Sequence, residues 1–202
     1  MSDISATVVK ELREISGAGM MDCKNALKEA SGDIKQAMDL LRKSGIAKAQ
    51  KKSGRTAKEG MVYSYIHPGS KLGVLIEINC ETDFVANTDD FVKLNKDLAM
   101  HVAASAPLAV KREDISSEVL EHEKAIYVDQ AKQSGKPDNI IEKMVEGRIN
   151  KFFQENVLLE QSFVKDPEKT VKDIITDTIA KLGENIIVSR FIRYQLGEQN
   201  NL

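Results

Sequence analysis

The chain has 202 residues, of which 42% are hydrophobic and 30% are charged, and its formal net charge is -2. This length allows one or two domains with a proper core. The near-neutral charge excludes an overall field that would draw the protein to nucleic acid or to a membrane. Two cysteines are too few for a disulfide scaffold, residues 1–4 lack a signal-peptide pattern, and no apolar run approaches the ~20 residues of a membrane span. We therefore expect a soluble, cytoplasmic protein.

The first 45 residues predict a bundle of three short helices. The first helix carries an apolar stripe at three- and four-residue spacing, made of Ile4, Val8, Leu12 and Ile15. Residues 17–19 (Gly-Ala-Gly) end it, and the second helix begins at Met20. The third begins with a capping box at Asp33 and is expected to end at Gly45. Such a bundle, with a glycine-containing loop after its first helix, resembles the ubiquitin-associated (UBA) domain.

Met20 and Met21 are neighbours, so at most one of them can point fully into the core. Methionine packs adaptably against irregular partner surfaces. Two interpretations stay open at this stage: the side chains fill the small core, or the pair contacts another protein.

Residues 42–58 form a basic connector with seven cations and no acid. Such a run could bind phosphates, but no aromatic residue interleaves to stack on bases. A solvated linker helix is one interpretation, and an RNA-associated adaptor is the alternative from a different functional class.

From Met61 the apolar pattern changes to the period of a strand. Residues 61–66 and 73–79 predict the two strands of a hairpin with a turn at 68–71, and His67 stands at the edge of that turn. One face of the second strand holds Val74, Ile76, Ile78 and Cys80. Residues 186–194 predict a third strand, which we expect to join the hairpin in a small antiparallel sheet.

The turn after the second strand, residues 79–87, places a large aromatic side chain in polar company. Thr82 and Asp83 could be explained by the start of a helix alone, but Phe84 would remain unexplained. It either folds back into the core or reaches into another protein.

The other segments predict mainly helices. A helix is expected at about 88–105, with His101 one residue from its apolar stripe and therefore on its surface. Two amphipathic helices, interrupted at residues 133–136 and restarted at Pro137, predict an antiparallel helical hairpin of coiled-coil type at about 116–160. A last helix is expected to start at the Asp166-Pro167 and Thr170 signals and to end at Gly183.

These elements predict an α+β fold with two parts. Residues 1–55 would form the three-helix domain with the basic linker, and residues 56–202 an α+β core that includes the helical hairpin as an arm. A three-stranded sheet packed with helices would form the centre of that core.

The sequence does not favour an enzyme. Cys80 with His67 or His101 is the only conceivable nucleophile and base pair, and the position of Cys80 on an apolar strand face is typical of a small buried hydrophobe. Glycine-rich phosphate loops, nucleophile elbows and zinc-protease motifs do not occur. Three separated histidines and two distant cysteines also make a metal site unsupported. We expect no cofactor.

Several motifs in order resemble one family. Residues 12–24 (LREISGAGMMDCK) look like the N-terminal signature of bacterial translation elongation factor Ts, and residues 82–86 (TDFVA) are similar to its central signature. Residues 100–105 (MHVAAS), 133–137 (QSGKP) and 143–148 (KMVEGR) look like further family segments. The resemblance covers nearly the whole chain.

The resemblance implies a guanine-nucleotide exchange factor for elongation factor Tu, the GTPase that carries aminoacyl-tRNA to the ribosome. It places Leu12, Met20 and Met21 in contact with the GTPase domain. The central signature, Thr82, Asp83, Phe84 and Val85, would enter near the bound magnesium ion of the GTPase. His67 would be pushed in nearby and help to shift the phosphate loop.

The chain departs from the longer members of the family in one respect. Those members carry two related core halves, with the Asp-Phe pair in one half and the hairpin histidine in the other. Here both features lie in a single half, which looks like the short form of the family. The resemblance therefore implies a homodimer, paired through the β-sheet, in a two-plus-two complex with the GTPase.

Overall fold

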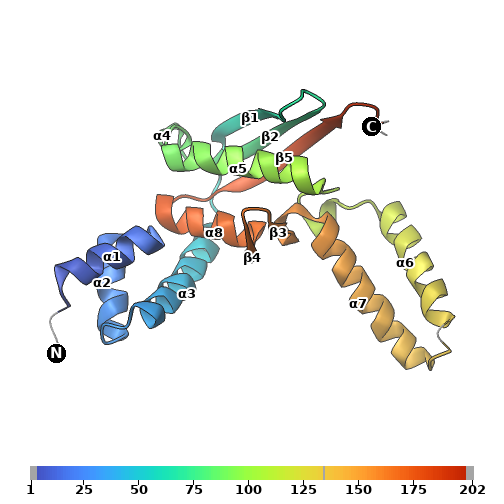
Figure 1. The fold of residues 1–202 in the computed structure, drawn as a ribbon, viewed down its shortest axis with the longest axis horizontal. Helices are drawn as coiled ribbons and strands as arrows, with labels where there is room; N and C mark the ends of the chain where they lie inside the picture. The colour runs from blue at the N-terminus through green and yellow to red at the C-terminus, as the bar shows by residue number, and fades with distance from the viewer. Residues whose placement is uncertain (1–3, 134, 199–202) are drawn as a thin grey trace. The chain divides into compact units, whose positions relative to one another are not determined.

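A computed structural model describes residues 4–133 and 135–198 of the chain (Figure 1). By its contacts the chain divides into two compact units. The first consists of Met1–Met61, Ile78–Asn95 and Asp173–Ile187, and the second of Val62–Glu77, Lys96–Lys172 and Val188–Leu202. The mixture of helices with a small antiparallel sheet confirms the α+β class. No helix in the described part of the chain is long and apolar enough to cross a membrane.

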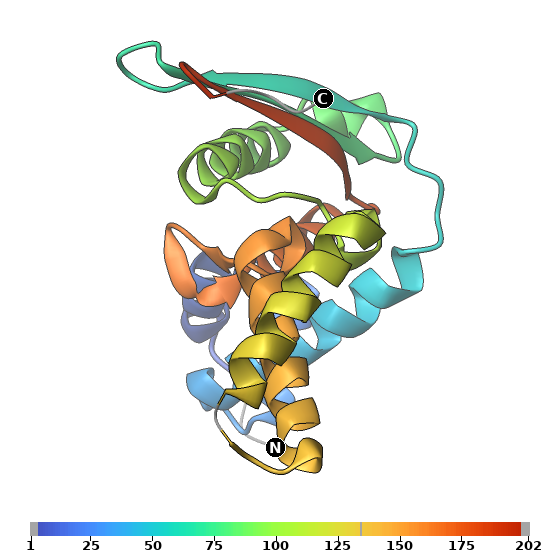
Figure 2. The same cartoon turned by 90° about the vertical axis from the view of Figure 1, so that its right-hand side faces the viewer.

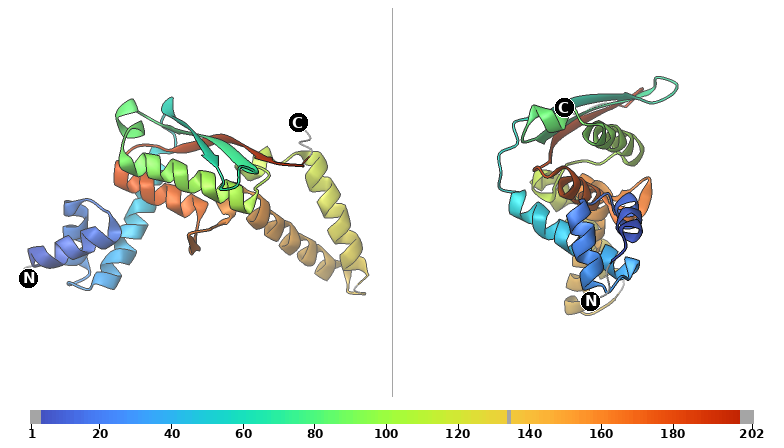
Figure 3. Two further views of the ribbon diagram at one scale, coloured as in Figure 1. Left: turned by 45° about the horizontal axis from the view of Figure 1, so that its top comes forward. Right: turned by 90° about the vertical axis from the view of Figure 1, so that its left-hand side faces the viewer.

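The first unit begins with three helices, α1 (Ala6–Ser16), α2 (Met20–Glu29) and α3 (Ile34–Lys52), which Figure 3 shows gathered together in blue and cyan. Their ends follow the local sequence. The C-cap Gly17 adopts φ +65°, a left-handed conformation that suits glycine, and the Asp33 side chain accepts a hydrogen bond from the Gln36 N–H at 2.9 Å. The core of this bundle contains Val9, Leu12, Cys23, Ala26, Leu27, Ala30 and Ala37.

Helix α3 does not end at Gly45, as the sequence suggested, but continues to Lys52. Gly45 lies inside the helix and is buried. A Cβ atom at this position would lie 3.3 Å from the Cβ of Ala180 in α8 (Val171–Leu182). Gly45 therefore does not cap the helix; it allows α3 and α8 to approach each other closely. The Thr170 signal for the last helix is confirmed, because α8 begins at Val171, whereas Asp166 and Pro167 lie in a strand.

The three-stranded sheet has the order β1-β2-β5, with β1 at Glu59–Ile66, β2 at Leu72–Cys80 and β5 at Ile187–Gln195. The His67 N–H donates to the Leu72 carbonyl at 2.9 Å and closes the hairpin between β1 and β2. The apolar face predicted for β2 is buried along its length, at Val74, Ile76, Ile78 and Cys80. At the other end of the hairpin Gly60 has φ +143°, and a Cβ there would lie 2.2 Å from the Ile78 carbonyl oxygen, so only glycine fits.

In the second unit, α6 (Ser117–Lys132) and α7 (Asp138–Asn156) pack side by side (Figure 2). Of the predicted break at residues 133–136, Ser134 lies outside the described residues. A short antiparallel pair follows, β3 (Ser162–Phe163) with β4 (Asp166–Thr170), which the sequence did not predict. Helix α5 (Asp89–Ser105) belongs in part to each unit, and its predicted stripe of Phe91, Leu94, Leu98 and Val102 is buried.

His101 in α5 is fully buried, not on the helix surface as expected. Its Nδ1 accepts a hydrogen bond from the Val164 N–H at 3.3 Å, so Nε2 carries the proton and donates to Gln161 Oε1 at 2.9 Å. The Gln161 amide in turn donates to the carbonyl oxygens of Ser105 and Glu155. The polar ring is satisfied by partners about 60 residues away, which the helical pattern could not show.

Burial lowers the pKa of His101 below its usual value of 6.5. As pH falls through 6.5 the unfolded chain takes up a proton at this position while the folded chain does not. The contribution of the neutral His101 to the free energy of unfolding is therefore fully present above pH 6.5, and it declines as the pH falls toward the pKa of the folded state. In urea unfolding at pH 7.5 and 5.5, His101→Gln should weaken this pH dependence by at most about 1.4 kcal/mol, because only about one pH unit of that interval lies below 6.5.

The exposed His122 on α6 supplies the matched control. The variant His122→Gln should keep the wild-type change in unfolding free energy between the two pH values. An equal change in all three proteins would contradict the assignment to His101.

Candidate protein-interaction site

The turn after β2 forms a one-turn helix, α4 (Asp83–Ala86). Thr82 is its N-cap, because the Thr82 Oγ1 accepts a hydrogen bond from the Val85 N–H at 3.4 Å. At the other end, the Asn87 side-chain amide donates to the Asp83 carbonyl at 2.8 Å. Local polar residues thus build this helix, as the sequence indicated for Thr82 and Asp83.

Helix α4 has an exposed side and a buried side. Phe84 is 81% exposed and Asp83 is exposed, whereas Val85 and Ala86 are 7% and 6% exposed. Val85 therefore anchors the helix in the free chain, and its contact with a partner stays a prediction. The alternative in which Phe84 folds into the core is wrong. An aromatic side chain this exposed forgoes ~1.5–3 kcal/mol of burial.

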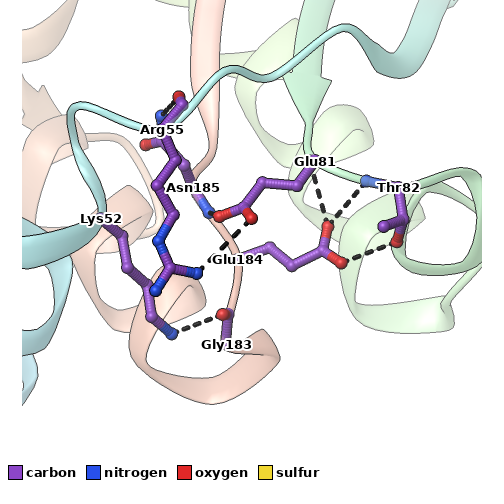
Figure 4. Close-up of polar contacts among 7 residues, drawn as sticks. All are labelled: Lys52, Arg55, Glu81, Thr82, Gly183, Glu184 and Asn185. Carbon is purple, nitrogen blue, oxygen red and sulfur yellow. Dashed lines mark hydrogen bonds and ion pairs between the residues drawn. The ribbon is translucent and has the colours of Figure 1, made fainter.

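Behind α4 lies a group of polar contacts that the sequence did not reveal (Figure 4). The Glu184 carboxylate accepts hydrogen bonds from the N–H groups of Glu81 and Thr82 at 3.1 and 3.0 Å, and from the Thr82 hydroxyl at 2.6 Å. Glu184 follows the helix-ending Gly183, and no spacing pattern connects it to Thr82. Only the folded chain brings them together.

His67 stands at the exposed end of the hairpin, as predicted. Its Nδ1 lies 2.9 Å from the Tyr65 hydroxyl, and the two rings meet edge to face at a centroid distance of 6.0 Å. Tyr65, which sequence reasoning passed over, thus restrains the imidazole from the neighbouring strand position. The rest of the ring remains available to a partner.

The end of α1 and the start of α2 carry further exposed apolar side chains. Ile15, Met20 and Met21 are 59%, 47% and 64% exposed. The interpretation in which both methionines fill the core is therefore wrong. Leu12, predicted with them as a contact, is completely buried in the bundle core of the free chain, and its contact with a partner stays a prediction.

The basic connector is largely engaged with neighbouring segments of the first unit. Lys48 Nζ lies 2.7 Å from an Asp22 carboxylate oxygen, and an Arg55 guanidinium nitrogen lies 3.5 Å from a Glu81 carboxylate oxygen. Lys52 donates to the Gly183 carbonyl. These contacts reduce the positive charge available to RNA and support the linker-helix interpretation for residues up to Lys52.

The candidate nucleophile Cys80 is inert. It is completely buried, and its thiol donates to the Thr82 carbonyl at 3.1 Å. Burial, together with the charge of Glu184, raises the pKa of the Cys80 thiol to about 11, so the reactive thiolate is rare at neutral pH. Within residues 4–133 and 135–198, no group of three His, Cys, Asp or Glu side chains could hold a metal ion.

The exposed Phe84 on α4, the exposed methionines at the start of α2 and the exposed hairpin histidine are typical of a protein that binds another protein. The family described as Elongation factor TS matches residues 2–198. The chain is 56% identical over 197 residues to an elongation factor Ts of Syntrophobacter fumaroxidans, covering 98% of each chain. It is 58% identical over 196 residues to that of Fervidobacterium nodosum, covering 97% of this chain and 100% of the relative. The chain belongs to the elongation factor Ts family.

Proposed function

We propose that this protein is the guanine-nucleotide exchange factor of elongation factor Tu. It binds the GDP-loaded GTPase, promotes release of GDP and is displaced as GTP reloads. The observation that carries this proposal, beside family membership, is the 81% exposure of Phe84 on a helix that is anchored from behind. The protein itself catalyses no chemical reaction, needs no cofactor and works in the cytoplasm on a protein rather than on nucleic acid.

Helix α4 acts as the probe. GTPases hold nucleotide through backbone N–H groups on the phosphates and through a magnesium ion that bridges phosphate oxygens. Asp83 and Phe84 enter beside that magnesium ion and displace the groups that position it, while Val85 and Ala86 keep the helix attached to its own core. Because linkage is reciprocal, a factor that weakens GDP binding is itself bound more weakly by the GDP-loaded GTPase, to the same degree.

Two further surfaces complete the contact. His67 approaches the phosphate-loop side of the GTPase, with Tyr65 restraining its ring. Leu12, Met20 and Met21, together with Ile15, dock the helical domain, and flexible or branched apolar side chains suit an irregular partner surface. We place these docking residues in a UBA-like domain of residues 1–55, followed by an α+β core of residues 56–202 with an arm at about 116–160.

The proposal is tested by nucleotide release. Elongation factor Tu loaded with fluorescent GDP is mixed with excess unlabelled GDP and increasing concentrations of this protein. We expect the release rate to rise and saturate as the factor is added. A release rate that stays at the intrinsic value at micromolar factor would overturn the proposed function.

We also propose that two copies pair through the open face of the sheet. The outward positions of β1, β2 and β5 carry Val62, Ile66, Leu75 and Tyr194, which are 65%, 63%, 46% and 51% exposed. Ile66 lies over Gly73, where an added Cβ would be 3.0 Å from its Cδ1, and Ile66, Leu75 and Tyr194 line a hollow of about 610 Å³. An apolar face of this kind is typical of a protein interface. Glu77 and Arg190, 2.7 Å apart, add a charge pair in the middle of the sheet.

A charge at the centre of this face should separate the copies. In a two-fold dimer Leu75→Glu introduces two carboxylates into one apolar interface, so we expect dimerisation to weaken at least about tenfold. Sedimentation velocity should show twice the mass of one chain for the wild type and a single chain for the variant. Val119→Glu, which alters a 40% exposed apolar residue of α6, is the control and should remain dimeric. A wild type that sediments as one chain, alone and with the GTPase, would contradict the pairing.

A further inference from the structure

Three segments that are distant in sequence meet next to Thr82, the N-cap of α4 (Figure 4). They are the connector after α3, the turn after β2, and the turn between α8 and β5. All three belong to the first compact unit. Two carboxylates, Glu81 and Glu184, hold these segments together.

The two carboxylates cap each other's backbone. Glu184 accepts from the N–H groups of Glu81 and Thr82, while Glu81 Oε1 accepts from the Asn185 N–H at 2.7 Å. The Asn185 side chain is 2% exposed and donates to the Arg55 carbonyl at 2.7 Å. The other oxygen of Glu81 faces the Arg55 guanidinium at 3.5 Å. The hydrogen bonds run in both directions between the turn after β2 and the turn after α8, because each of these two turns supplies one carboxylate that accepts and backbone N–H groups that donate.

The contact with Thr82 reaches the first turn of α4. The Thr82 hydroxyl donates to Glu184 Oε1 at 2.6 Å, which leaves its oxygen lone pair free to accept from the Val85 N–H. The direction of the capping hydroxyl is therefore set by Glu184. A helix of four residues cannot maintain itself, because forming one isolated turn is unfavourable. Its orientation depends on the groups that hold its first residues.

We propose that Glu184 is a positioning residue for nucleotide exchange: its carboxylate orients α4 so that Phe84 projects away from the core at a defined angle. This inference rests on the proposed function of α4 as the probe. Glu184 itself touches neither nucleotide nor magnesium. It acts through Glu81 and Thr82, whose N–H groups a carboxylate binds more strongly than a neutral acceptor does.

The test compares two substitutions at this position in the full chain. Glu184→Ala removes all three acceptor contacts, and the maximal rate of GDP release at saturating factor should fall about tenfold. Glu184→Gln keeps a carbonyl oxygen for the two N–H groups but turns an amide N–H₂ group, which cannot accept, toward the Thr82 hydroxyl. Its maximal rate should lie between those of Glu184→Ala and the wild type, with a loss of about threefold.

A control variant separates positioning from general stability. Asp90→Asn removes a carboxylate that lies 2.6 Å from Lys181 and joins α5 to α8 in the same unit. A purely structural loss reduces the amount of competent factor, so it raises the half-maximal concentration but leaves the maximal rate unchanged. For Asp90→Asn we expect no change larger than a raised half-maximal concentration, with the maximal rate of the wild type. For Glu184→Ala we expect a lower maximal rate.

Amide hydrogen exchange tests the geometry without the GTPase. The N–H groups of Glu81 and Thr82 should exchange at least about tenfold faster in Glu184→Ala than in the wild type, while Asp90→Asn should leave them unchanged. Unchanged exchange at these two amides, or a wild-type maximal rate in Glu184→Ala, would overturn the positioning role. Failure of the wild type to accelerate GDP release would instead overturn the proposed function and leave the amide result standing.

Discussion

Replacing Phe84 with alanine is expected to lower the maximal rate of GDP release about 10- to 100-fold, while the concentration of factor needed for half the effect changes little. The phenyl ring is 81% exposed in the free protein, and under the proposed mechanism it is buried only when α4 displaces the groups around the magnesium ion. Its burial therefore stabilises the state from which GDP leaves rather than the initial complex. Full burial of such a ring stabilises by ~1.5–3 kcal/mol, and each 1.4 kcal/mol corresponds to about a factor of ten in rate. Stopped-flow release of fluorescent GDP measures both quantities.

Because Phe84 is exposed, its replacement should affect exchange without affecting the stability of the fold. Since Phe84 contributes little to the core, Phe84→Ala should unfold at nearly the wild-type temperature. Leu108→Ala, at another exposed apolar residue with 59% exposure, is the matched control and should keep the wild-type rate. If Phe84→Ala released GDP as fast as the wild type, the exposed ring would have no part in exchange.

Replacing Met20 and Met21 together with alanine should have the opposite kinetic signature. We expect the half-maximal concentration to rise about tenfold or more, with the maximal release rate unchanged. The two side chains are 47% and 64% exposed, and the apolar area that they could bury in a partner is worth ~1–3 kcal/mol of binding. They lie on the helical bundle and not on α4, so their loss weakens docking without shortening the probe.

Titration of release rate against factor concentration separates the two effects. Ile140→Ala, which alters a 37% exposed residue of α7, is the control for removal of an exposed apolar side chain. A double methionine variant that binds normally but melts at a lower temperature would show that these residues support the bundle rather than the complex.

Much of the local structure could be predicted from the chain. The stripe Phe91, Leu94, Leu98, Val102 and the strand face Val74, Ile76, Ile78 are buried as their periods indicated. The errors occurred where a residue's usual local role was overridden by a distant neighbour. Gly45 was expected to end a helix, but it lies within α3, where an added Cβ would be only 3.3 Å from the Cβ of Ala180. His101 was expected at the surface, but Gln161 and the Val164 N–H satisfy it in the interior.

The candidate site shows the same division. The family motifs identified Asp83 and Phe84 but could not distinguish the exposed side chain from its buried neighbour Val85. They also could not show that Leu12 faces the bundle core while Met20 faces solvent. Which side of a one-turn helix faces solvent depends on what packs behind it, and a motif of consecutive residues contains no such information.

The sequence by itself determined the family and the periodic elements and led to the proposal of Asp83 and Phe84 as the probe, because these inferences rest on residues that are close together in the chain. Only the tertiary structure decided how the probe is held. The bonds from Glu81 and Thr82 to Glu184 join residues separated by 103 and 102 positions. Hydrogen bonds of this kind need donors and an acceptor within about 3 Å of one another, and folding alone brings these groups to that distance.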